Sequence, residues 1–501
     1  MSSLSTGGIG ISEFLEGQNF LITGGTGFLA KVLIEKMLRT NPAVGKIYVV
    51  IKAKDTGEAL KRLQNEVVGT ELFKCLQEIH GTDYNSFIER KVVPVIGDVR
   101  KANLGIAPEL ADEITEQVDI IVNSAANTKL HERYDVSIDI NTLGPFRIMS
   151  FVQHFRRLKL LLHVSTAYVN GRRKGVVLES PFRLGDTIEK DLGSSDYPDY
   201  KNATLDIETE IKLAFGSGRH SDDSTFHNEM KDLGLQRFGV TDGPFPRHYR
   251  ANIHGCQDTY VFTKAMGEMV INCMRGDTPV VVIRPSIIES TMNEPFPGWI
   301  QGERSRMIIH LCNCVSVLIT IIIGAKIPVD MVVNAMLASI AKHGGTQDAG
   351  AGVQVYQVAS AAVNPFLTRD ASKYIYQHFT RSPIVDTEGN PIAIQPLQFA
   401  DSMEKLISDL ETKAMLQHSG DTRTIKQIKH LLKIYEPYTA CGAKFDTTNT
   451  MALLADMSLE EKARFNFDAR SIDWMDYIDN VHIPGLKKHI LKEGLRNPTP
   501  P

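Results

Sequence analysis

The sequence has 501 residues, of which 43% are hydrophobic and 23% charged, so it can bury a large core and exceeds the usual size of a single domain. The formal net charge is only −4, and no run of Lys and Arg with interleaved aromatic residues occurs. These features exclude the electrostatic footprint of a nucleic-acid-binding protein. We therefore expect two domains and neither DNA nor RNA as a partner.

The N-terminal segment predicts no targeting signal. Residues 1–17 contain neither Lys nor Arg and no apolar stretch. A secretory signal needs both features and a transit peptide is rich in Arg, so a cytoplasmic protein is expected. The six cysteines are scattered, and Cys312-Asn-Cys314 is too closely spaced for the usual zinc pair, so we expect reduced thiols and no metal site.

Short apolar runs alternate with amphipathic stretches from Gln18 onward. This alternation predicts an α/β fold with a doubly wound parallel Rossmann sheet, whose strands are buried on both faces. A helix is expected to begin at Gly27 and to end near Arg39, because Asn41-Pro42 follows. The predicted strands are 19–23, 46–51, 91–96, 118–123, 158–164 and 279–283.

A glycine-rich turn joins the first predicted strand to this helix. Gly24 and Gly27 permit a tight turn and a close approach of the backbone to a ligand, and the helix N-terminus offers N–H groups to a pyrophosphate. A turn without a ligand is the alternative, but the position after the first strand favours dinucleotide binding. The predicted cofactor residues are Thr23, Gly24, Gly25, Thr26, Gly27, Phe28 and Leu29.

The second predicted strand ends in cations instead of the acidic residue of NAD-specific sites. Lys52 or Lys54 would bind a 2′-phosphate, which predicts NADPH, although two solvated surface lysines would give the same pattern. Two other strand ends fit the adenosine side of the site, where Asp98 would accept a hydrogen bond from the adenine amino group. The predicted residues there are Asp98 and Val99, then Asn123, Ala125 and Ala126.

The candidate reacting groups are Ser165 and Thr166 at the end of the fifth strand, and Tyr260 and Lys264 at the start of a helix. Residues i and i+4 project from one helical face, so the Lys264 ammonium can lower the pKa of Tyr260. Tyr260 would then donate a proton, while Ser165 or Thr166 holds a carbonyl oxygen. A lone Tyr-x-x-x-Lys pair usually lies on an exposed helix surface. The catalytic assignment therefore depends on the position of this pair downstream of the dinucleotide turn and of the Ser-Thr pair.

The combination resembles extended short-chain dehydrogenases, and the wider sequence resembles plant alcohol-forming fatty acyl-CoA reductases over nearly the whole chain. The strings that carry the resemblance are Thr23–Ala30, Gly97–Val99, Asn123–Ala126, Ile140–Gly144, His163–Asn170, Tyr260–Lys264, Ile283–Ser286, Pro297–Gly302 and Val329–Ala335. The apolar run Met307–Ile323 departs from the more polar, glycine-containing stretch of that family.

The resemblance implies NADPH-dependent reduction of a long-chain or very-long-chain acyl-CoA to a primary alcohol and CoA in two hydride steps. It also implies that Asn141 supports Lys264 through water. Cofactor contacts are further implied for Arg284, Pro285 and Ser286. A sugar-nucleotide or sterol dehydrogenase, or a non-catalytic NADPH-binding sensor, is the alternative. The wide interval from Thr166 to Tyr260 argues against a sugar-nucleotide or sterol dehydrogenase. The presence of the Tyr/Lys pair argues against a non-catalytic sensor.

The domain prediction follows from these elements. Met307–Ile323 is interpreted either as a buried element or as a membrane-embedded one, so peripheral association with the endoplasmic reticulum stays open. Acyl chain length and oligomeric state are not predicted. The expected parts are an N-terminal segment 1–17, a catalytic domain 18–345 with a substrate insertion at about 171–257, a linker 346–395, and a smaller, mainly helical C-terminal domain 396–490.

Overall fold

The computed structural model describes residues 7–130, 132–188, 204–215, 254–301, 325–345, 352–383, 438 and 442–491. The chain forms two compact units. The first comprises Met1–Ser286, Val329–Ala359 and Ala443–Asp468, and the second Ile287–Pro328, Ser360–Gly442 and Ala469–Pro501. The apolar run Met307–Ile323 lies outside the described residues.

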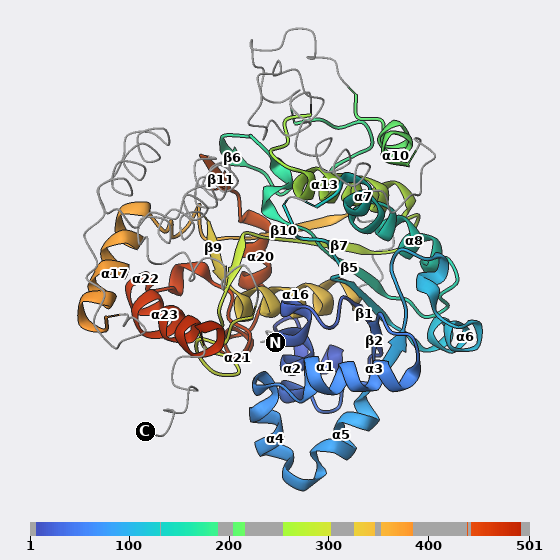
Figure 1. The fold of residues 1–501 in the computed structure, drawn as a ribbon, viewed down its shortest axis with the longest axis horizontal. Helices are drawn as coiled ribbons and strands as arrows, with labels where there is room; N and C mark the ends of the chain where they lie inside the picture. Colours follow the sequence, from blue (N-terminus) through green and yellow to red (C-terminus); the bar gives the residue numbers. More distant parts are fainter. Residues whose placement is uncertain are drawn as a thin grey trace, which may run out of the picture. The chain divides into compact units, whose positions relative to one another are not determined.

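A seven-stranded parallel sheet forms the centre of the first unit (Figure 1). Its order is β10-β7-β5-β4-β1-β2-β3, so the predicted doubly wound Rossmann sheet is confirmed. Neighbouring strands β1 and β4 are the point at which the strand order reverses, where such sheets bind ligands beyond their carboxyl ends. The strands are β1 (Phe20–Thr23), β2 (Ile47–Ile51), β3 (Val92–Ile96), β4 (Ile120–Asn123), β5 (Leu160–Val164), β7 (Val280–Pro285) and β10 (Gln354–Val358).

The six predicted strands are confirmed, and β10 is an additional one. It lies inside the stretch 346–395 that the sequence analysis interpreted as a linker. Its sequence, Gln-Val-Tyr-Gln-Val, contains two glutamines, and among the described strands it pairs with β7 alone, at the edge of the sheet. The two glutamines leave β10 without the continuous apolar run by which the other strands were predicted. The predicted domain boundaries themselves stay a prediction.

Helices cover both faces of the sheet. Residues of α6 (Pro108–Gln117), α8 (Leu143–Val152) and α13 (Thr259–Met274) share one apolar core with strand residues such as Leu21 and Leu161. Helices α2 (Phe28–Thr40) and α16 (Val329–Gly344) pack together on the other side (Figure 1). The predicted helix after the glycine-rich turn is thus confirmed. Further helices of this unit are α1 (Ile11–Leu15), α3 (Thr56–Leu63), α4 (Lys74–His80), α5 (Tyr84–Lys91), α7 (Tyr134–Asn141), α10 (Ile207–Phe215), α20 (Thr448–Ala455) and α21 (Leu459–Arg464).

A buried carboxylate joins the insertion and the C-terminal strand to the sheet. Strand β6 (Gly175–Val177) pairs in parallel with β11 (Ala443–Phe445). Just beyond β6, Glu179 accepts hydrogen bonds from Gln357 N at 2.6 Å, Asn449 N at 2.5 Å and Thr450 Oγ1 at 2.8 Å. Residues from β10 and the start of α20 therefore converge on one side chain.

The second unit is built from chain segments far apart in sequence. Strand β8 (Ile287–Glu289) pairs with β9 (Lys326–Pro328). Ser290 Oγ lies 3.0 Å from both Tyr477 Oη and His482 Nδ1, which fixes the helical segment near the C-terminus. The helices described there are α17 (Thr368–Arg381), α22 (Trp474–Asp476) and α23 (Ile483–Gly485). Across the described residues, no helix combines the length and apolarity that a membrane span requires.

Candidate active site

The glycine-rich turn lies directly against the neighbouring strands. Gly24 has φ +69°, and a Cβ there would lie 2.8 Å from Ala125 N, so only glycine fits. A Cβ at Gly25 would lie 2.1 Å from Val49 Cγ1 of β2. Gly27 caps α2 without a side-chain hydrogen bond. The turn therefore brings backbone N–H groups to a helix N-terminus with no side chains in the way, an arrangement that fits the pyrophosphate of a dinucleotide.

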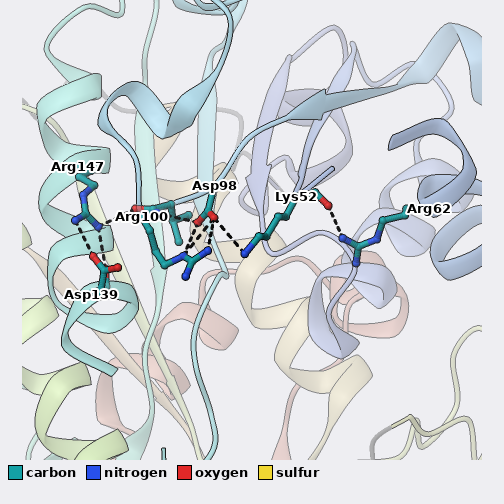
Figure 2. A network of polar contacts seen from close by, with 7 residues as sticks. Lys52, Arg62, Asp98, Arg100, Asp139 and Arg147 are labelled. Carbon is teal, nitrogen blue, oxygen red and sulfur yellow. Dashed lines mark hydrogen bonds and ion pairs between the residues drawn. The ribbon is translucent and has the colours of Figure 1, made fainter. Parts of the chain in front are cut away.

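Polar side chains cluster where β2 and β3 end (Figure 2). Asp98 accepts hydrogen bonds from Arg100 Nη2 at 2.7 Å, and Lys52 Nζ lies 3.5 Å from the same carboxylate. The Arg100 guanidinium holds the pKa of Asp98 well below its usual range, although partial burial opposes the shift. Asp98 is thus ionised and orients Lys52, whose side chain is two-thirds exposed. Exposed Lys54 lies two residues further on.

Two further arginines stabilise this cluster, and neither was predicted from the sequence. Arg62 of α3 donates to the Lys52 carbonyl at 2.5 Å, so it fixes the backbone that carries Lys52 (Figure 2). Arg147 of α8 donates to the Val99 carbonyl at 3.2 Å and to Asp139 of α7 at 2.7 Å. No local pattern marks either arginine, because each acts across a tertiary contact.

The Ser-Thr pair directly follows β5 and bonds to the carboxyl end of the neighbouring strand β7. Ser165 N donates to the Ile283 carbonyl at 2.7 Å, and Thr166 Oγ1 to the Pro285 carbonyl at 3.4 Å. In the part of the chain that the structure describes, Ser165 Oγ and Ser286 Oγ are buried without a hydrogen-bond partner. Buried polar groups normally have partners, so these hydroxyls fit a site where a bound cofactor or substrate supplies them.

Helix α13 carries the other two candidate catalytic residues, as predicted. Asp258 caps it by accepting from Val261 N at 2.8 Å. Tyr260 is half-buried near its start, and Lys264 is completely buried one turn later. Lys264 Nζ donates to the Val164 carbonyl at 2.6 Å. Burial lowers the pKa of Lys264 to about 8, with Glu268 opposing the shift.

Asn141 lies where α7 meets α8, next to α13. Its Nδ2 donates to the Asn127 carbonyl at 2.9 Å and to Thr263 Oγ1 at 3.1 Å, while Oδ1 accepts from Asn127 N at 2.9 Å. A Cβ at Gly267 would lie 2.3 Å from the Asn141 carbonyl, so glycine permits the close packing of these helices. Asn141 thus positions the segment after β4, and its water-mediated support of Lys264 stays a prediction.

Arg284 is a predicted cofactor contact, but its side chain is fully buried in the protein. Its guanidinium is completely buried and donates to Glu268 of α13, with Nη2 to Oε2 at 2.6 Å. The pair ties β7 to the helix of Tyr260 and Lys264. A direct contact of Arg284 with a cofactor therefore stays a prediction, whereas the following Ser286 presents its unpartnered hydroxyl.

Two family models match the chain. The first, an NAD-binding model described as male sterility protein, covers residues 22–336, and a second with the same description covers 402–493. Fatty acyl-CoA reductase 2 of Arabidopsis thaliana, a chloroplastic protein, is 46% identical over 97% of this chain and 80% of its own length. The chain belongs to the fatty acyl-CoA reductase family. The alcohol-forming fatty acyl-CoA reductase of Simmondsia chinensis is 34% identical, over 96% of this chain and 99% of its own.

Solved structures show the same fold at low identity. The terminal R domain of the myxalamid biosynthetic pathway has a TM-score of 0.56 at 16% identity, over 96% of this chain and 92% of that domain. The reductase domain of a nonribosomal peptide synthetase from Mycobacterium tuberculosis has a TM-score of 0.53 at 17% identity, over 97% and 96%. These likenesses show the Rossmann fold, and the match to the NAD-binding family model shows a nicotinamide cofactor site.

Proposed function

We propose that the chain reduces long-chain or very-long-chain acyl-CoA to a primary alcohol and CoA, with NADPH as the reductant. The observation that carries the proposal is that Tyr260 and buried Lys264 lie one turn apart on α13, and that Lys264 Nζ bonds to the carbonyl of Val164, the residue before Ser165 with its unpartnered hydroxyl. The family assignment favours an acyl-CoA over a sugar nucleotide or a sterol. The Tyr/Lys pair favours an enzyme over a non-catalytic sensor.

NADPH, when bound, supplies the hydride. Ser165 or Thr166, together with Tyr260, donates hydrogen bonds to the thioester oxygen, which becomes negative as the carbonyl carbon is reduced. Collapse of the tetrahedral adduct breaks the carbon–sulfur bond and releases CoA and an aldehyde. The second reduction needs the hydride of a second NADPH, which converts the aldehyde to an alkoxide. The Tyr260 hydroxyl gives its proton to this alkoxide, which forms the alcohol. Lys264 stabilises the resulting tyrosinate by its charge.

NADPH is preferred over NADH in this proposal. Lys52 stands at the end of β2, where an acidic residue would bind the ribose diol of NAD. Ionised Asp98 orients its ammonium, and Arg62 fixes its backbone (Figure 2). Exposed Lys54 adds a second cation. This arrangement supports a 2′-phosphate ligand.

Three exposed apolar side chains in the described part of the insertion support an acyl substrate and a peripheral membrane contact. Val176, Leu178 and Leu184 are 67%, 61% and 54% exposed. Each buried methylene of an acyl chain contributes about 0.8 kcal/mol, so such a surface distinguishes chain lengths by the area it covers. We propose that the protein works at the cytoplasmic face of the endoplasmic reticulum. The chloroplast of the 46% identical relative is the competing location, and imaging of a fluorescent fusion separates the two.

The first experiment is product identification. Purified protein is incubated with NADPH and a mixture of saturated acyl-CoAs, and the lipids are identified by gas chromatography and mass spectrometry. A primary alcohol is the expected product. Aldehyde alone would contradict the second reduction, and no lipid product despite measurable NADPH binding would contradict acyl-CoA as the substrate. UDP-sugars and sterols serve as comparison substrates.

A further inference from the structure

Three polar side chains form a row across the carboxyl end of the sheet. Thr23 of β1 pairs in register with Asn123 of β4, which pairs with His163 of β5. Residues paired in this way project from the same face. Two residues earlier in each strand, Leu21, Ile121 and Leu161 belong to the apolar core beneath α8 and α13. On this face of the sheet, the apolar residues therefore give way to three buried polar side chains at the carboxyl ends of the strands. These side chains lie beside α13, the helix that carries Lys264.

The row forms a chain of hydrogen bonds with a defined direction. Thr23 Oγ1 accepts from Ala125 N at 3.1 Å and donates its single hydrogen to Asn123 Oδ1 at 2.8 Å. That assignment leaves Asn123 Nδ2 as the group facing His163 Nδ1 at 2.9 Å. An amide NH₂ can only donate, so His163 Nδ1 accepts and its proton resides on Nε2.

The far side of His163 faces the catalytic lysine. His163 Nε2 lies 3.4 Å from Lys264 Nζ, which also donates to the Val164 carbonyl at 2.6 Å. His163 is completely buried, and burial followed by the charge of Lys264 lowers its pKa well below the usual value. The imidazole is thus neutral. The Nε2–H can donate to Lys264 Nζ only when the lysine is a neutral amine, whose lone pair then points at His163 while a hydrogen points at the Val164 carbonyl. The charged ammonium is held by the Val164 carbonyl.

The other charged groups near Lys264 are already paired. Glu268 lies one turn later on α13 and is bound by Arg284 of β7. His163 is therefore the neighbour through which the dinucleotide turn reaches the lysine in the described structure.

We propose that His163 is a positioning residue for Lys264 and the last link of a hydrogen-bond chain that couples the dinucleotide turn at Thr23 to the catalytic lysine. Binding of the pyrophosphate at the turn restricts Thr23 further, and the chain transmits that restriction through Asn123 to the lysine amine. The role of Lys264 rests on the proposed function, whereas the chain itself does not.

The test compares His163→Phe, which keeps a planar ring without hydrogen bonds, with His163→Gln, whose amide restores a donor near the position of Nε2. We expect His163→Phe to lower kcat by about tenfold to a hundredfold, because small misplacements of catalytic groups have effects of this size. The Kd of NADPH should stay within about threefold, the pH profile of kcat should shift, and His163→Gln should recover most of the loss. A kcat within about twofold of wild type, or a loss confined to KM, would overturn the proposal.

Coupling along the chain is tested with a double-mutant cycle. Thr23→Val and His163→Phe should have strongly non-additive effects on kcat, because both break the same chain. Thr40→Val is the matched control, since Thr40 Oγ1 bonds only within its own helix, to the Lys36 carbonyl at 2.7 Å. It should leave kcat unchanged and be additive with His163→Phe. Additivity in the first cycle would overturn the coupling.

A spectroscopic readout separates this proposal from the proposed function. In protein with ¹⁵N-labelled histidine, the signal that disappears in His163→Gln should show the neutral Nε2–H tautomer. It should move when NADPH is added to wild type and stay unmoved in Thr23→Val. This outcome supports the chain even if no acyl-CoA is reduced. An Nδ1–H tautomer, or equal responses in wild type and Thr23→Val, would overturn it.

Discussion

Arg284 and Glu268 form a completely buried ion pair, with Nη2 and Oε2 2.6 Å apart, between strand β7 and the helix of the candidate catalytic residues. Breaking one partner leaves an uncompensated buried charge. We expect Arg284→Met to reduce the free energy of unfolding by about 3–5 kcal/mol, measured by urea denaturation. The double variant Arg284→Met/Glu268→Leu should recover much of this loss, since it removes both charges. A double variant no more stable than the single one would contradict the explanation.

Replacing Tyr260 tests the proton donor. Tyr260→Phe removes one hydroxyl from a half-buried side chain and leaves α13 and its Asp258 cap in place. We expect kcat to fall by about a hundredfold or more, as for the loss of a general acid, with NADPH affinity within about threefold of wild type. Single-turnover rates and fluorescence titration measure the two quantities. Unchanged turnover would refute the catalytic assignment of Tyr260.

Local patterns were sufficient to predict the strands, the glycine-rich turn and the helix of Tyr260 and Lys264. Each of these features is encoded within a few residues, by apolar runs, by glycines or by an i, i+4 spacing. Strand β10 was missed because its two glutamines interrupt the apolar run by which the other strands were predicted. Its role in the sheet depends on pairing with β7, which sequence periodicity does not reveal.

The polar contacts of the site depend on register and could not be predicted. Thr23, Asn123 and His163 are separated by 100 and 40 residues in the chain, yet they are neighbours in the sheet. A histidine within Leu-Leu-Leu-His-Val has no local signature of its role. Arg62 likewise becomes significant only where α3 turns back onto the Lys52 carbonyl.

Cofactor choice is tested by reversing one charge. Lys52→Glu places an acidic group where it can accept from the ribose hydroxyls of NADH and repel a 2′-phosphate. We expect NADPH affinity to fall by about tenfold or more, because a charge-assisted contact is lost, with little loss for NADH. Lys74→Glu is the control, since it changes the same charge on exposed Lys74, paired only loosely with Glu78 at 3.8 Å. Equal losses for both cofactors would refute the phosphate contact.

Burial of Lys264 makes the stability of the cofactor-free protein depend on pH. The pKa of Lys264 is lowered from 10.5 to about 8 by burial, with Glu268 opposing, so the unfolded chain binds more protons between these values. Burying the charged Lys264 therefore destabilises the folded protein fully below about pH 8. This destabilisation decreases as the pH rises from about 8 to about 10.5. A shift of this size corresponds to at most about 3 kcal/mol. We expect Lys264→Met to be inactive but more stable than wild type at about pH 7.5, by up to that amount in urea denaturation. The difference should shrink as the pH approaches 10.5, whereas exposed Lys61→Met should match wild type throughout. A constant difference between Lys264→Met and wild type would show that packing, not ionisation, sets the stability at this position.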